Sequence, residues 1–272
     1  MQNSKDLLTF LRQRLLAKSV GSGDDAYILS SLSKVQAQFK PHPQDMPYSD
    51  VIVVAQTWGV GSCYCYCEDP VLPTDILGMD ARNVQTGNRC IDIAVLDAAY
   101  SNVRPQPSIR CLLEGTSFQK AEARASLIHS EIQSLSRDIQ HDNPHITMVG
   151  AVGNILSVLS DGKNTLYATD FDTTLIGKKL GGVLVEHGSM TLSRISQSQI
   201  ALVTGMTLTT DTLRDIIVIS KQNNVKVIVY AQTGGNLAGE YLELGVDCVI
   251  SEEYPFYMFP GITKVSIFRN AR

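Results

Sequence analysis

The pattern of hydrophobic and polar positions changes near residue 143. Before this point, helical spacings and two short alternating runs follow one another without a regular order. After it, apolar runs alternate with helical stretches, which is typical of βαβ units and a parallel sheet. The pattern predicts an α/β fold in two domains: an N-terminal α+β domain over residues 1–143 and a C-terminal Rossmann-like parallel-sheet domain over residues 144–272.

The first domain is predicted to contain helices and one hairpin. Thr116 and Gln119 have the spacing of a capping box at the start of a long helix. Glycines at 59 and 61 separate two β-branched or alternating runs, which indicates two strands joined by a tight turn. The predicted helices cover 4–18, 26–39, 89–103 and 115–139, and the predicted strands cover 50–58 and 62–68.

The second domain is predicted to bind its ligand in the turns that follow its strands. In an open parallel sheet, ligands collect in the crevice beyond the carboxyl ends of the strands. The turns expected there are rich in Gly, Thr, Asn and Asp, which offer backbone N–H groups and hydroxyls to an anion. The candidate ligand-binding residues are Gly150, Gly153, Asn154, Asp170, Thr204, Gly205, Thr233, Gly234, Gly235 and Asn236.

These turns do not carry the dinucleotide fingerprint. In "GAVGN" the second glycine of G-x-G-x-x-G is missing, and Val152 stands one residue before Gly153. Asp170 nevertheless stands where a ribose-binding acid would be. The alternative prediction is therefore an enzyme with a nucleotide-type cofactor such as S-adenosylmethionine, in which Glu186 or His187 transfers protons.

Composition and charge exclude several classes of partner. The formal net charge is −4 and no Lys/Arg-rich run occurs, which argues against nucleic acid and anionic membranes. No stretch is long and apolar enough to span a bilayer, and charges interrupt the apolar residues near the N-terminus. We expect a cytoplasmic protein that binds a small molecule or a metal and is compatible with a homodimer.

The run "GSCYCYCEDP" at 61–70 is the candidate metal site. If the run is a strand, Cys63, Cys65 and Cys67 share one face, and the outer pair lie about 13 Å apart along the backbone. Two sulfurs on one zinc ion can be no more than about 4.6 Å apart, so a strand supplies two ligands at most. The open alternative is a row of small apolar side chains facing a core. Thiolates would favour a soft or borderline metal such as Zn, Cu or Cd.

Four stretches resemble a known family. They are "CIDIAVLDAAYSN" (90–102), "ITMVGAVGN" (146–154), "ALVTGMTLTTDTLRDII" (201–217) and "VKVIVYAQTGGNLAGEYLELGVDCVIS" (225–251). The chain is similar over about residues 50–270 to a bacterial and archaeal domain-of-unknown-function family labelled "putative heavy-metal chelation". The cysteine run in the hairpin is a departure from that family.

The resemblance implies an enolase N-terminal-like domain joined to a Rossmann-like domain, with a ligand site at their junction. It also implies a link to heavy metals or to metal chelators. Together with the residues above, it predicts small-ligand binding in an interdomain cleft, where the cysteine hairpin reaches over the turns of the parallel sheet.

Overall fold

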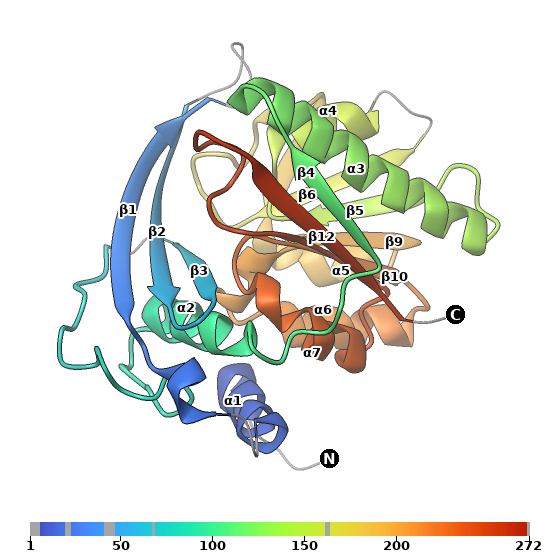
Figure 1. Ribbon diagram of the computed structural model, residues 1–272. Helices are drawn as coiled ribbons and strands as arrows, with labels where there is room; N and C mark the ends of the chain where they lie inside the picture. Colours follow the sequence, from blue (N-terminus) through green and yellow to red (C-terminus); the bar gives the residue numbers. More distant parts are fainter. Residues whose placement is uncertain (1–5, 20–22, 41–46, 67–68, 161–163, 271–272) are drawn as a thin grey trace.

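The protein is described by a computed structural model covering residues 6–19, 23–40, 47–66, 69–160 and 164–270. Its strands form a three-stranded antiparallel sheet and a nine-stranded mixed sheet (Figure 1). The predicted α/β fold is confirmed. The strands are β1 (Ser31–Phe39), β2 (Tyr48–Gln56), β3 (Val60–Cys65), β4 (Ile109–Leu113), β5 (His145–Val149), β6 (Thr165–Asp170), β7 (Lys179–Leu180), β8 (Val183–His187), β9 (Ile200–Thr204), β10 (Lys226–Ala231), β11 (Cys248–Glu252) and β12 (Thr263–Arg269).

The larger sheet has the order β4-β12-β11-β10-β9-β5-β6-β8-β7. All pairs from β11 to β8 are parallel, whereas β12, β4 and β7 join antiparallel at the edges. Because β5, β6 and β8 progress to one side and β9, β10 and β11 to the other, the order reverses between β5 and β9. Doubly wound sheets bind their ligands at this reversal.

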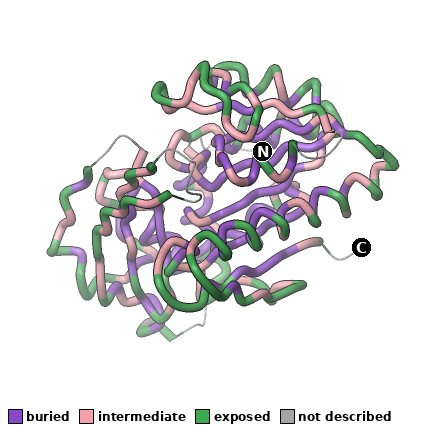
Figure 2. Tube along the Cα trace, turned by 90° about the horizontal axis from the view of Figure 1, so that it is seen from above, coloured by how far each residue is buried: buried purple, intermediate pink, exposed green. Residues whose placement is uncertain are grey.

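Helices cover both faces of the larger sheet. The helices are α1 (Leu7–Lys18), α2 (Arg89–Tyr100), α3 (Ser117–Asp138), α4 (Gly153–Ser160), α5 (Thr191–Ile195), α6 (Leu213–Gln222) and α7 (Ala238–Leu244). α3 and α4 share one core with the sheet, and α1, α2, α6 and α7 share the core on the opposite face. Figure 1 shows the strands of the larger sheet between α3 and α4 on one side and α2, α6 and α7 on the other, and in Figure 2 most exposed residues lie toward the outside of the molecule. Within the described residues, no helix has both the length and the apolar character needed to cross a membrane.

The predicted helix at 26–39 is wrong, since most of this segment is strand β1. Val35, Ala37 and Phe39 alternate with polar residues, and β1 pairs with β2 along its whole length. Val35 and Phe39 pack against the core between the two sheets, and this packing stabilises an extended backbone, in which alternate side chains share one face. The hairpin β2–β3 and the Thr116 capping box are confirmed.

Strand β4 was not predicted from the sequence. It pairs with β12 at the edge of the larger sheet, and α3, which follows it, packs against α4. Residues 109–138 thus contact the larger sheet although they precede residue 143. The division into domains 1–143 and 144–272 stays a prediction.

The hairpin is held close to α2 by Gly61. A Cβ atom at Gly61 would lie 2.0 Å from the backbone nitrogen of Ala98 and 2.3 Å from the carbonyl oxygen of Ala94. Replacing Gly61 by alanine is therefore expected to push β3 away from α2 and lower the free energy of unfolding by about 1–3 kcal/mol. Urea denaturation followed by circular dichroism measures this loss.

Gly23→Ala is the matched control, because a Cβ atom there meets nothing within 4 Å and its φ of −58° suits alanine. An equal loss of stability in both variants would contradict close packing of β3 on α2 as the cause.

Candidate functional site

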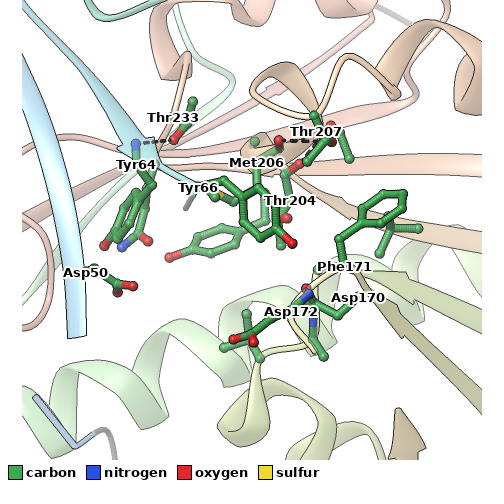
Figure 3. Close-up of a pocket in the computed structure, with 18 of the residues that line it drawn as sticks. Asp50, Tyr64, Tyr66, Asp170, Phe171, Asp172, Thr204, Met206, Thr207 and Thr233 are labelled. Carbon is green, nitrogen blue, oxygen red and sulfur yellow. Dashed lines mark hydrogen bonds between the residues drawn. The ribbon is translucent and has the colours of Figure 1, made fainter. Parts of the chain in front are cut away.

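A cavity of about 390 Å³ lies where the hairpin of the smaller sheet meets the larger sheet (Figure 3). Its size is in the range of small-molecule sites. The walls come from three places: the smaller sheet, the turns after β5, β6, β9 and β10, and buried aromatic residues. The lining residues that carry the argument are Asp50, Tyr64, Tyr66, Arg124, Gly150, Val152, Asp170, Asp172, Thr204, Thr207, Tyr230 and Tyr257.

The turns after β5 and β9 place the cavity at the reversal of strand order. Gly150 follows β5 with φ of +85°, and a Cβ atom there would lie 2.1 Å from the Thr204 hydroxyl oxygen at the end of β9. Only glycine allows the two strand ends to approach this closely. The cavity is therefore built from the point at which a doubly wound sheet binds ligands.

Two carboxyl groups lie on the wall beside this turn, Asp170 at the end of β6 and Asp172 just after it. Asp170 accepts hydrogen bonds from the backbone N–H groups of Ala151 and Asp172, at 2.7 and 2.9 Å. One oxygen of Asp172 accepts the N–H of Thr174 at 2.8 Å. Burial, opposed by these N–H groups, raises the pKa of Asp170 above its usual range. The wall is therefore acidic, and backbone N–H groups of the same wall hold its two carboxyl groups in place.

Asp50 reaches the cavity from the opposite wall. It extends from β2 toward the side on which Asp172 lies (Figure 3). Burial, followed by the negative charge of Asp172, raises the pKa of Asp50 to about 6. The cavity thus brings together acids from both sheets, and Asp50 was not among the residues selected from the sequence.

The tyrosines of the "CYCYC" run, rather than all its thiols, line the cavity. Alternate residues of a strand point to opposite faces. Tyr64 and Tyr66 lie on the cavity side, and Tyr64 stacks on Phe256 with ring centroids 5.5 Å apart. Cys65 also touches the cavity, whereas Cys67 lies outside the described residues.

Cys63 is fully buried on the opposite face of the strand, beside Cys90 of α2. Burial raises the pKa of its thiol well above the usual range, which disfavours the thiolate needed to bind a metal. Within the described ranges, no group of three or more His, Cys, Asp or Glu side chains could hold a metal ion. The described thiols therefore do not form a metal site by themselves.

The predicted turn at 233–236 holds the hairpin in place. The Thr233 hydroxyl accepts the N–H of Tyr64 at 2.9 Å, and the N–H of Gly234 donates to the carbonyl oxygen of Ser62 at 3.2 Å. The Asn236 amide donates to the carbonyl oxygens of Val60 and Asp97, at 2.8 and 3.0 Å. Of the predicted residues in this turn, Thr233 lines the cavity, while Gly234, Gly235 and Asn236 lie behind it.

The predicted residues near β5 and β9 divide in the same way. Gly150, Asp170, Thr204 and Gly205 line the cavity. Gly153 and Asn154 start α4 behind this wall, where the side-chain amide oxygen (Oδ1) of Asn154 accepts a hydrogen bond from Arg124 at 2.8 Å. Asn154 thus supports a residue that reaches the cavity.

A buried Arg124 network forms the floor of the cavity. Arg124 donates to the Tyr230 hydroxyl at 3.0 Å, and its guanidinium lies 3.9 Å from the centre of the Tyr257 ring. Glu252 lies 3.9 Å from Arg124 and accepts hydrogen bonds from the Tyr230 hydroxyl and the Tyr257 N–H. The charge of Arg124 is therefore balanced inside the protein before any ligand binds.

The residues proposed for proton transfer lie outside the cavity lining. Glu186 forms an ion pair with Arg194, whose hydrogen bonds lower the pKa of the carboxyl group. His187 is exposed and contacts Ser189. These placements do not favour an enzyme with a nucleotide-type cofactor that uses Glu186 or His187.

Residues 136–249 match the model of the DUF364 family, described as "Putative heavy-metal chelation". Two solved structures, each described as a protein with unknown function from this family, share the fold. One from Desulfitobacterium hafniense DCB-2 is 15% identical with a TM-score of 0.57, covering 90% of this chain and 87% of that chain. One from Pyrococcus horikoshii is 11% identical with a TM-score of 0.57, covering 97% of this chain and 99% of that chain. The resemblance inferred from the sequence is confirmed. A search of curated proteins found no match.

Proposed function

We propose that the protein binds a small organic ligand of the metal-chelator class in the cavity between the two sheets. The observation that carries the proposal is the convergence of the strand-order reversal, two acidic walls and a hairpin of tyrosines on one cavity. The family description supplies the link to metals. Aromatic walls with a few placed polar groups are typical of sites for organic molecules.

In this proposal the metal arrives bound to its chelator. A soft or borderline ion such as Zn, Cu or Cd needs several donors, and the buried Cys63 thiol disfavours the ionised form. Cys65 at the cavity, and Cys67 beyond the described residues, are candidates for one further thiolate contact with a metal held by the ligand. The chelator supplies the remaining donors.

The location proposed for the protein is the cytoplasm. No disulfide joins the five cysteines of the described residues, although Cys63 and Cys90 lie beside each other. Reduced cysteines in this number suit a reducing compartment.

Binding of chelators is expected to stabilise the protein. Citrate, 1,10-phenanthroline and triethylenetetramine, each alone and as its zinc complex, are compared with zinc alone by thermal unfolding. A ligand at a hundred times its dissociation constant adds about 2.7 kcal/mol to the free energy of unfolding. At least one chelator is expected to raise the melting temperature above the effect of zinc alone.

Val152→Phe tests whether this binding occurs in the cavity. Val152 is half-buried and lines the cavity, so a larger side chain would fill part of it. Val158→Phe is the matched control, a half-buried valine of α4 that does not line the cavity. Loss of the shift in the first variant alone is expected, and a shift that survives in both would contradict the proposed site.

A further inference from the structure

We propose that Asp50 binds a protonated amine of the ligand, with Asp172 facing the same group from the opposite wall. This inference rests on the proposed function and narrows its ligand to a chelator that carries a protonated amine apart from the donors that hold the metal. Asp50 would act as the ligand-contacting carboxylate that the smaller sheet contributes to the cavity.

Asp50 has no hydrogen-bond or ion-pair partner among the described residues, although it is largely removed from solvent. Its surroundings add negative rather than positive charge, since Asp172 is the charged neighbour that acts on it. A carboxylate in such a place costs free energy unless a donor or a cation joins it. A ligand with N–H donors and positive charge would supply both.

A second group beside Asp50 also lacks a partner. The Tyr64 side chain is buried, with 9% of its surface exposed, and its hydroxyl makes no hydrogen bond within the described part of the chain. Burial, followed by the charge of Asp50, raises the pKa of this hydroxyl, so it stays protonated. An oxygen or nitrogen of a ligand bound next to Asp50 would satisfy the Tyr64 hydroxyl as well.

The acids suit an organic cation better than a bare metal ion. Both oxygens of Asp170 and one of Asp172 already accept backbone N–H groups. In the described ranges, no three acidic, histidine or cysteine side chains come close enough to hold a metal. An ammonium group does not need several ligand atoms at one point, because its N–H donors can reach separate acceptors.

An anionic group would find little at this wall. Among the described residues that line the cavity, Arg124 is the one with a basic side chain. Its charge is paired with Glu252 and spread over hydrogen bonds to Tyr230 and Asn154. The acids are therefore the unbalanced charges that a ligand meets.

Binding is expected to depend on the protonation of Asp50. The folded-state pKa of about 6 lies above the ordinary value of 3.8, so the carboxylate is present above pH 6 and is lost as the pH falls through 6. Amine binding should follow the carboxylate, being strong at pH 8 and weak at pH 5. The other charged and titratable groups that line the cavity in the described residues are Arg124, Asp170, Asp172, Cys65, Tyr48, Tyr64, Tyr66, Tyr230 and Tyr257.

The test compares triethylenetetramine with triethylene glycol, in which oxygens replace the four nitrogens. Isothermal titration calorimetry of the full chain at pH 8 is expected to detect the amine and not the glycol. Asp50→Asn should weaken amine binding about 10- to 100-fold, the loss typical of a hydrogen bond to a charged group. Asp75→Asn, an exposed acid outside the cavity, should leave binding unchanged.

Folding of the Asp50→Asn variant is checked by its melting temperature. Because the ionised Asp50 is disfavoured in the folded state, the variant is expected to melt at or above the wild-type temperature at pH 8. Weak amine binding then cannot be ascribed to misfolding. At pH 5 the amine remains protonated, so a weakening that occurs in the wild type and is absent in Asp50→Asn reports on Asp50.

Equal binding of the amine and the glycol, or unchanged amine binding by Asp50→Asn, would overturn the role of Asp50. Binding of zinc alone that is lost in Asp50→Asn would also overturn it, because the acids would then hold an inorganic cation. If citrate or phenanthroline still binds to the wild type and no longer binds to Val152→Phe, the proposed function stands even though the role of Asp50 is wrong. If no chelator binds, both proposals fail.

Discussion

Replacing Glu252 by alanine is expected to lower the free energy of unfolding by about 3–5 kcal/mol, the typical cost of breaking a buried ion pair. Glu252 and Arg124 are both almost completely buried, and their charged atoms lie 3.9 Å apart. Without the carboxylate, Arg124 would keep a buried positive charge with no counter-charge. The Tyr257 N–H, which donates to Glu252 at 2.6 Å, would also lose its acceptor. Chemical denaturation measures the loss.

Glu253→Ala is the control, since this neighbouring acid is partly exposed and pairs with Arg104. It should cost no more than about 1 kcal/mol. The double variant Arg124→Met/Glu252→Gln removes both buried charges. It is expected to be more stable than Glu252→Ala, because no unpaired charge is left in the interior. Equal losses at 252 and 253 would contradict the account of the cavity floor.

Replacing Asp97 by alanine is expected to release the hairpin from the larger sheet. Asp97 is buried in α2, and its two oxygens accept the backbone N–H groups of Ser62 and Asn236 at 2.9 and 2.7 Å. Each N–H left without an acceptor costs about 1–3 kcal/mol, so the variant should lose about 2–6 kcal/mol. Chelator binding should weaken as well, because β3 carries Tyr64 to the cavity.

Denaturation and calorimetry on the same variant separate these effects. Asp92→Ala is the matched control on α2, since Asp92 accepts hydrogen bonds from Thr86 and not from the hairpin. It should lose some stability while keeping its ligand affinity. Unchanged affinity in Asp97→Ala would show that the cavity does not depend on the docking of the hairpin.

Burial raises the pKa of Asp97 to about 7, which gives this contact a pH dependence. The folded state holds the proton more tightly than the unfolded state, whose ordinary value is 3.8. The stabilising contribution of protonated Asp97 is therefore present at low pH and is lost as the pH rises through 7. Helix α2 thus carries an ionisable group at the point where the hairpin is attached.

The sequence predicted the larger sheet well because its signal is local. Each βα unit between residues 145 and 252 combines a short apolar run, a turn and an amphipathic helix. The position of the cavity followed from the same signal, since the carboxyl ends of parallel strands meet at one edge. Gly150, Asp170, Thr204 and Thr233 were selected in this way and line the cavity.

The smaller sheet was harder to predict because its strands depend on long-range contacts. In β1, an alternating pattern is diluted by serine, lysine and glutamine, and its pairing partner β2 begins only at Tyr48. Edge strand β4 is short and mostly exposed, so it has little hydrophobic signal of its own. Both strands are stabilised by partners that are distant in sequence, and local propensity does not report these partners.

Asp50 and Asp97 of the first half were missed for a related reason. Asp50 opens an apolar β-branched run, and Asp97 interrupts a helix that is apolar on nearly every side. A carboxyl group in such a setting needs a partner, and this signal was available in the sequence. The sequence does not tell which face of the strand Cys63 and Tyr64 point to, because both residue types suit either face of a buried strand.

A crystal structure of the protein with the tightest-binding chelator tests the central claim most directly. We expect the ligand between the β2–β3 hairpin and the turns after β5 and β9, with a nitrogen within hydrogen-bond distance of Asp50. A ligand ordered elsewhere on the molecule, or a metal held by cysteine thiols beside an empty cavity, would contradict the account.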